Sequence, residues 1–114
     1  MIGAIRFYPE PLRSIAAGLI GGGYQPVGSA FAHAIYWIHL VNDTDVALVF
    51  SWDGVTDHVF LPSGGFLVMD ITANQTKTDV GLFFSVGQKI YVNNVTSDPS
   101  TGIVSLSAFY ASGG

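Results

Sequence analysis

The sequence predicts an all-β domain, an antiparallel β-sandwich of jelly-roll-like order with an extended N-terminal arm. From position 34 onward, runs rich in β-branched and aromatic residues recur, and clusters of Gly, Pro, Asn, Asp and Ser separate them roughly every eight to twelve residues. Spacing of this kind is typical of sandwiches. A chain of 114 residues suits one domain. We therefore divide it into an arm, residues 1–32, and a β-sandwich domain, residues 33–114.

The first 32 residues lack the regular pattern of the rest. Leu12, Ile15 and Leu19 fall on a helical stripe, but Gly18 and the glycine run 21–23 oppose a helix. Glycine inside a helix costs about 1 kcal/mol relative to alanine. Three prolines also stiffen this segment. We therefore favour an extended arm that packs on a neighbouring subunit or on the surface of a larger protein assembly, with a short helix as the alternative.

The domain is expected to contain strands joined by turns. The predicted strands span residues 34–41, 46–52, 58–61, 66–72, 81–86, 89–92 and 103–111. Turn signals such as Asp53-Gly54 separate them. In the last strand alternate residues from Val104 to Tyr110 are apolar and serines lie between them. One face of that strand therefore belongs in the core.

The strand at 34–41 is apolar on both faces. Ile35 and Trp37 fall on one face, and Tyr36, Ile38 and Leu40 on the opposite one. Such a strand is either covered twice or lies at an interface. We expect Tyr36 and Ile38 to face outward and to form the contact.

The low charge of the chain predicts an oligomer. Only 11% of the residues are charged, against about 25% in typical soluble domains. A monomer with this composition would expose more apolar surface than monomers usually tolerate, and closed symmetric assembly buries such a surface. We expect a homo-oligomer; the family resemblance given below implies a trimer in preference to a dimer. The predicted interface residues are Tyr8, Leu12, Tyr36, Ile38 and Leu40.

Charge and cysteine content argue against several functions. The net charge of −4 opposes nucleic-acid binding, which needs clustered Lys and Arg. No run of 18 apolar residues indicates a membrane span, and the first residues do not resemble a secretory signal. The absence of cysteine excludes disulfides and thiolate metal sites.

The densest polar cluster contains Asp53, Asp57 and His58. These residues would suit a metal site or an acid–base pair, but Asp and Thr in turns commonly bond local backbone amides, and we favour that interpretation. A zinc site needs three or four ligands, and His33 and His39 lie far away in sequence.

The remaining candidates for chemistry are weaker. Asp43 and Asp45 form an Asp-x-Asp pair without the Gly and Glu of a calcium-binding loop. Trp37, Trp52 and the tyrosines would suit a sugar-stacking platform, although core and interface roles are favoured. No nucleophile–base pair is recognisable. We therefore predict no catalytic, cofactor-binding or metal residues, and we do not expect an enzyme.

One segment has a family resemblance. The turn Asn42-Asp43-Thr44-Asp45 leads into a strand ending Ser51-Trp52-Asp53-Gly54, then Thr56-Asp57-His58, then a strand ending in proline and glycine. This pattern resembles one in small structural proteins of tailed bacteriophages. The similarity extends to Ile5-Arg6-Phe7-Tyr8-Pro9, Lys89-Ile90-Tyr91-Val92 and Ala108-Phe109-Tyr110-Ala111. It implies a virion component and carries over no catalytic residues.

Two functional hypotheses follow from the resemblance. The first is a non-enzymatic virion structural protein, a capsid decoration or cement protein that stabilises the head through contacts with the major capsid protein or other virion proteins. The second is a binding module for carbohydrate or a host surface on a tail, collar or baseplate. A chain without cysteine suits assembly in the reducing bacterial cytoplasm.

Overall fold

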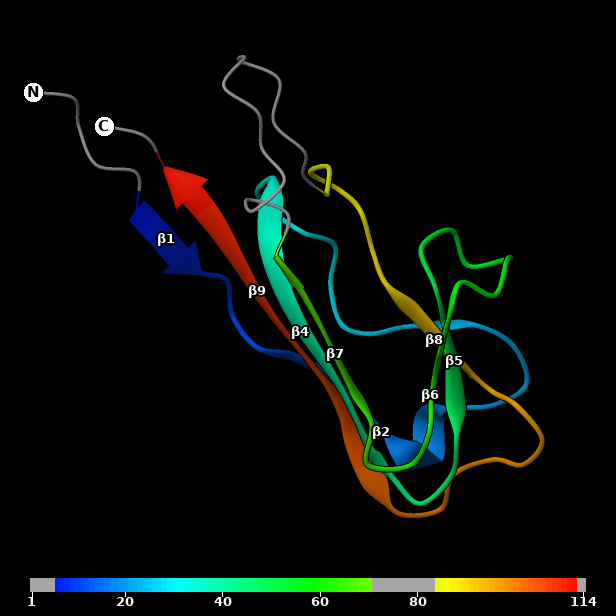
Figure 1. Ribbon diagram of the computed structural model, residues 1–114. Helices are drawn as coiled ribbons and strands as arrows, with labels where there is room; N and C mark the ends of the chain where they lie inside the picture. The colour runs from blue at the N-terminus through cyan, green and yellow to red at the C-terminus, as the bar shows by residue number, and fades with distance from the viewer. Residues whose placement is uncertain (1–5, 71–83, 113–114) are drawn as a thin grey trace, which may run out of the picture.

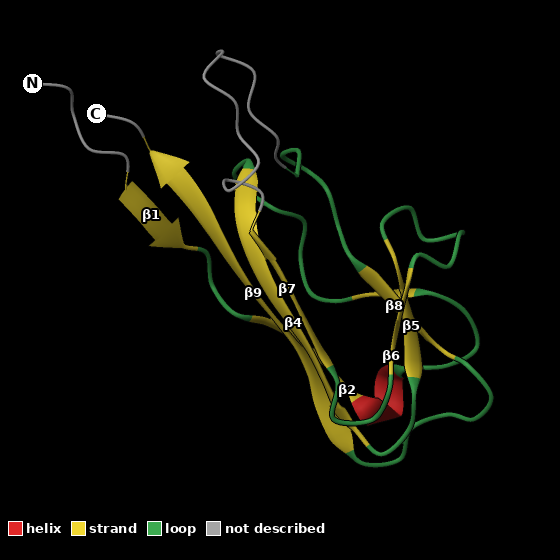
Figure 2. Ribbon diagram, in the orientation of Figure 1, coloured by secondary structure: helices red, strands yellow, loops and turns green. Residues whose placement is uncertain are grey.

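The computed structural model describes residues 6–70 and 84–112. Two antiparallel sheets pack face to face, which confirms the all-β sandwich (Figures 1 and 2). The elements are β1 Arg6–Pro9, β2 Arg13–Ala16, the 3₁₀ turn η1 Ala17–Leu19, β3 Gln25–Pro26, β4 Ile35–Thr44, β5 Leu48–Ser51, β6 Val59–Leu61, β7 Phe66–Asp70, β8 Tyr91–Asn94 and β9 Gly102–Ser112. Residues 81–83, half of the predicted strand 81–86, lie outside the described residues.

The strand order places β6 and β7 at sheet margins. The long sheet has the order β1-β9-β4-β7, and β2 also pairs with β9. The short sheet has the order β3-β8-β5-β6. The chain passes from β6 to β7 through a tight turn, so these two margins lie on the same side of the sandwich (Figure 1). The jelly-roll order is not confirmed.

The N-terminal segment is part of the sandwich. β1 and β2 pair with β9, and β3 pairs with β8. Ile15, Ile20, Val27 and Phe31 belong to the core. For the described residues the prediction of a separate arm ending at residue 32 is therefore wrong. Pro9 ends β1 and Pro26 ends β3, so these prolines belong to short strands, and the glycine run 21–23 lies in the connection before β3. The alternative of a short helix yields only the single turn η1.

A bulge in β4 decides which of its faces is buried. The β4–β9 register shifts between Ile35, opposite Tyr110, and Trp37, opposite Phe109. The extra residue moves Ile35 onto the same face as Ile38 and Leu40, and all three side chains are fully buried. The prediction that Ile38 faces outward is therefore wrong, and Leu40 is likewise a core residue.

The core fills the space between the inner faces of the two sheets. As predicted for the last strand, Val104, Leu106 and Ala108 of β9 are buried. The buried members of the core are Ile15, Ile20, Val27, Phe31, Ile35, Ile38, Leu40, Leu48, Phe50, Leu61, Ile90, Val92, Val104, Leu106 and Ala108.

One buried polar side chain joins the two sheets where the chain passes from β4 to β5 and from β6 to β7. The amide nitrogen of Asn42, which is fully buried, donates to the carbonyl oxygens of Val46 (3.0 Å), Leu61 (3.1 Å) and Pro62 (3.1 Å). Its amide oxygen accepts hydrogen bonds from the backbone N–H (3.1 Å) and the hydroxyl (2.6 Å) of Thr44. The side chain thus ties β4 to the β4–β5 turn and to the end of β6.

Removing this amide should destabilise the whole domain. Asn42→Ala leaves the carbonyl groups of Val46, Leu61 and Pro62 without their donor in a dry environment, so we expect a loss of about 3 kcal/mol in the free energy of unfolding. Asn42→Asp keeps the shape of the side chain but places a carboxylate oxygen against those carbonyl oxygens, which repel it. This variant should lower the free energy of unfolding at neutral pH by at least as much as Asn42→Ala. Urea unfolding measures both.

The control for this prediction is Asn94→Ala. Asn94 donates to Asp98 at the protein surface, so its removal should change stability by less than about 0.5 kcal/mol. Equal effects at positions 42 and 94 would contradict the role assigned to the buried amide.

Candidate interaction surface

The outward side of the long sheet carries an apolar surface on β4 and β7 that extends to β9 at Phe109. We call it the outer apolar face; its members are Trp37, His39, Val41, Phe66, Val68 and Phe109. The register places His39 beside Val68, Val41 beside Phe66, and Trp37 beside Phe109. Phe66 is 65% exposed and Val68 47% exposed. Aromatic and β-branched residues facing one another across strands stabilise a sheet, which explains why these strands form here.

The rings on this face contact one another edge to face. The centroids of Trp37 and Phe109 are 5.0 Å apart, with ring planes at 82°. His39 meets Phe66 at 5.8 Å and 79°. On the described parts of β4 and β7 the acidic residues, Asp43 and Asp70, stand at the ends of this face rather than within it. The surface therefore has a rigid apolar centre and a polar rim.

The residues predicted as an interface are not brought together there. Tyr8 is 39% exposed, but its ring stacks on that of Tyr110, with centroids 5.5 Å apart, on the opposite side of the long sheet from the outer apolar face. Leu12 is exposed in the connection between β1 and β2. Tyr36 is half-buried at the bulge. On β4, the predicted residues Ile38 and Leu40 belong to the buried face, whereas the exposed apolar residues are on the opposite face.

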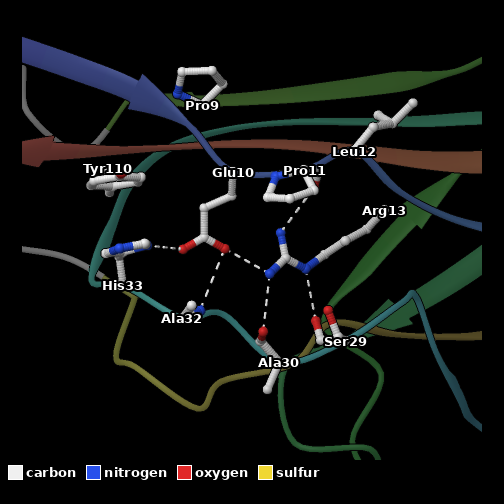
Figure 3. A pocket seen from close by; sticks show the side chains of 10 residues that line it. All are labelled: Pro9, Glu10, Pro11, Leu12, Arg13, Ser29, Ala30, Ala32, His33 and Tyr110. Atoms are coloured by element: carbon white, nitrogen blue, oxygen red, sulfur yellow. Dashed lines mark hydrogen bonds and ion pairs between the residues drawn. The ribbon is translucent and has the colours of Figure 1, made fainter.

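A buried charged cluster lies beside β1 and β2, and Figure 3 shows how its side chains converge. The guanidinium of Arg13 donates to Glu10 Oε1 at 2.6 Å and to the carbonyl oxygens of Ser29 (2.7 Å) and Ala30 (3.0 Å). His33 Nδ1 lies 2.7 Å from Glu10 Oε2. The side chains of Glu10 and Arg13 are 1% and 6% exposed, whereas that of His33 is 47% exposed.

The cluster acts as a structural clamp. Burial raises the pKa of Glu10, but the hydrogen bonds from His33, Arg13 and the Ala32 N–H outweigh it and leave the pKa below its ordinary value. The imidazole of His33 also stacks on Tyr110, with centroids 3.6 Å apart. A cavity of about 310 Å³ adjoins these residues. Because the carboxylate and guanidinium are occupied by each other and by the backbone, they hold the β1–β2 segment against residues 29–33.

The clamp could not be found from the sequence. Its three members are spaced at positions 10, 13 and 33, which matches no motif. The sequence shows only that basic residues are scarce, with four in the chain. That one of them, Arg13, is buried becomes visible only in the structure.

The Asp53 turn is confirmed. Asp53 Oδ1 accepts hydrogen bonds from the backbone N–H groups of Thr56 and Val55 (both 2.8 Å) and from the Ser51 hydroxyl (2.7 Å). These bonds, that of Thr56 foremost, hold the pKa of Asp53 well below its usual range. His58 Nδ1 accepts from the Trp52 N–H at 3.0 Å.

The other acidic candidates also have protein partners. Asp57 accepts a hydrogen bond from the Tyr24 hydroxyl. Burial and this bond raise the pKa of Tyr24. Asp45 accepts from the hydroxyl (2.6 Å) and N–H (2.9 Å) of Ser100, which lowers its pKa to about 2. Within residues 6–70 and 84–112 no three His, Asp or Glu side chains converge to hold a metal ion.

Comparisons with known proteins give little further guidance. No family model and no curated protein matches the chain. One solved structure, from Bacillus endospore appendages described as a family of disulfide-linked pili, is similar over 95% of this chain and 88% of that one. The sequence identity is 14% and the TM-score is 0.42. The described part of the chain contains no helix that could cross a membrane.

The clamp makes stability depend on pH. The pKa of Glu10 in the folded state lies below its ordinary value of 4.5. The stabilisation that the ionised carboxylate gives to the folded state is therefore complete at neutral pH and is lost as the pH falls through the folded-state pKa. Glu10→Gln leaves Arg13 buried without its counter-charge and should cost about 3 kcal/mol at pH 7. The difference from the parent protein should shrink in acid. Urea unfolding at several pH values measures it.

The matched control replaces an exposed carboxylate. Asp43→Asn should change the free energy of unfolding by less than about 0.5 kcal/mol. If Glu10→Gln and Asp43→Asn behave alike at pH 7, the clamp does not hold the N-terminal strands in the way described.

Proposed function

We propose that the protein is a non-enzymatic structural component of a virion, a capsid decoration or cement protein that acts through protein–protein contacts as a homo-oligomer. The observation that carries the proposal is the outer apolar face, a rigid apolar surface with exposed Phe66 and Val68 at one margin. The sequence resemblance to small structural proteins of tailed bacteriophages supports the virion setting.

Physical considerations favour a protein as the partner for this face. Burying an exposed Phe or Val side chain gains about 1.5–3 kcal/mol. Because the centre of the face carries no carboxylate or ammonium group on β4 or β7, covering it strips water from no acidic side chain and from no lysine there. The face also lies on paired strands, so little conformational entropy is lost on binding.

A carbohydrate-binding module of a tail or baseplate is the second candidate. The aromatic rings of Trp37 and Phe66 on one sheet surface favour it, since sugars stack on such rings. However, Trp37 is half-buried and contacts Phe109 edge to face, so its ring does not offer an open flat platform. A protein surface is therefore the preferred partner.

The function can be tested on particles. Phage particles purified by density gradient from cells producing this protein should contain it in a fixed ratio to the major shell protein. His39→Asp places a carboxylate at the centre of the outer apolar face and should lower occupancy more than tenfold, because a charge would be buried without a partner. Quantitative mass spectrometry of the particles measures occupancy.

The control is Phe60→Asp on β6. Phe60 is 60% exposed but belongs to the short sheet, so this variant should bind particles like the parent protein. Particles that lack the protein altogether would contradict the proposal. Binding to a glycan array that is lost in the His39→Asp variant would instead support the second candidate.

A further inference from the structure

The margin of β7 is an open hydrogen-bonding edge in the described structure. The backbone of Asn42 faces β7, since its N–H donates to Gly65 O (2.9 Å) and its carbonyl accepts from Gly64 N–H (2.8 Å). In an antiparallel pair every second residue bonds to the same neighbour. Leu67 therefore bonds to β4, while Phe66 and Val68 direct their N–H and C=O groups away from it.

Within the described residues, this edge lacks the usual protection against pairing. Monomeric proteins place Lys, Pro or a bulge on exposed edges to prevent strands from adding to them. In β7 the residues Phe66, Leu67, Val68 and Met69 are all apolar, and the acidic Asp70 comes only at the end. The described residues contain no strand that pairs with this edge. An added strand could form hydrogen bonds with the backbone N–H and C=O groups of Phe66 and Val68 and could pack its side chains against the apolar side chains of β7.

The space beside the edge also fits an added strand. A cavity of about 380 Å³ lies between β7 and the short sheet, lined by Trp52, His58, Val59, Leu67 and Met69. Side chains alternate between the faces of a strand. A strand paired with β7 would direct one set of side chains into this apolar cavity and the other set onto the outer apolar face.

We infer that this edge binds the β7 strand of a second copy of the chain, antiparallel and around a twofold axis. The inference deepens the proposed function, on which it rests for the need to assemble, by naming one partner. In the register that places Phe66 opposite Val68 of the partner subunit, both exposed side chains form aromatic–β-branched pairs, which stabilise a sheet. Leu67 lies on the axis and faces the cavity side.

Side-chain pairing favours this register over the one shifted by two residues toward Asp70. That shift would place Val68 on the axis and set Phe66 against a carboxylate-bearing residue, Asp70 of the partner subunit. In the proposed register the two Asp70 residues are six strand positions apart, roughly 20 Å. Because that distance exceeds the Debye length of about 8 Å at physiological salt, the repulsion between these two carboxylates is largely screened.

The pairing joins the two long sheets into one. Because a twofold axis uses the same surface on both subunits, the assembly closes as a dimer. The outer apolar faces of the two subunits then form one surface, and the two cavities adjoin across Leu67. A larger contact surface is thereby available for a shell protein. The trimer expected from the sequence would need a different contact.

Light scattering on the purified protein tests the assembly. The parent should have a mass of about 24 kDa at micromolar concentration, twice the chain mass of 12.1 kDa. Val68→Pro removes an N–H that does not bond to β4, a place where proline is tolerated, and should weaken the dimer more than tenfold. Val41→Lys alters the outer apolar face but not the edge and should remain dimeric. Circular dichroism confirms folding of both variants.

Cross-linking tests the register. The chain has no cysteine, so introduced thiols pair only with each other. Facing residues in this register are about 5.5 Å apart, within disulfide reach. An oxidised mixture of Phe66→Cys and Val68→Cys proteins, one carrying a larger tag, should yield mixed covalent dimers, whereas each variant alone should not.

The outcomes separate this inference from the proposed function. A 12 kDa or 36 kDa particle, or a dimer that Val41→Lys disrupts and Val68→Pro does not, would overturn the β7 pairing. None of these results depends on phage particles. A dimer with the expected cross-links that is absent from particles would leave the pairing intact and contradict the virion proposal.

Discussion

The buried amide of Asn42 is the interaction on which the arrangement of both sheets depends. It lies where the chain leaves β4 for the short sheet, and it bonds to carbonyl groups at the end of β6, where the chain returns. The β6–β7 turn is thereby fixed, and with it the register of β7 on β4. The position of Phe66 and Val68 at the sheet margin is a consequence of this one network. An apolar residue at position 42 could fill the space but could not bond the turn.

Alternation identified the buried side only where a strand has one polar face. In β9 the serines between Val104 and Tyr110 identified the buried side, and the structure agrees. β4 has apolar residues on both sides, so the pattern carried no information about which side is buried. The bulge after Ile35 arises from pairing with β9, a strand about 70 positions away along the chain. Local sequence does not encode such a contact, and Ile38 and Leu40 were therefore predicted on an exposed face although they are buried.

The N-terminal segment was misjudged for a related reason. Its prolines and glycines fit an extended arm as well as a series of short strands, because both use backbone that is neither helical nor regularly alternating. What separates the two is the non-local clamp of Glu10, Arg13 and His33, together with pairing to β9. Arg13 needs its Glu10 counter-charge and the carbonyl groups of residues 29 and 30 at once. Only the folded chain brings these groups together, so the clamp could not be predicted from the sequence of the N-terminal segment.

The low charge of the chain has a sharper meaning once the structure is known. Arg13 is buried in the clamp and contributes nothing to the surface, so at most three of the four basic residues of the chain are available there. The acidic residues of β4 and β7 stand at the ends of the outer apolar face. A charge introduced at its centre would make the monomer more soluble while raising the cost of covering that face. Solubility and the proposed assembly would therefore place opposite demands on the same few positions.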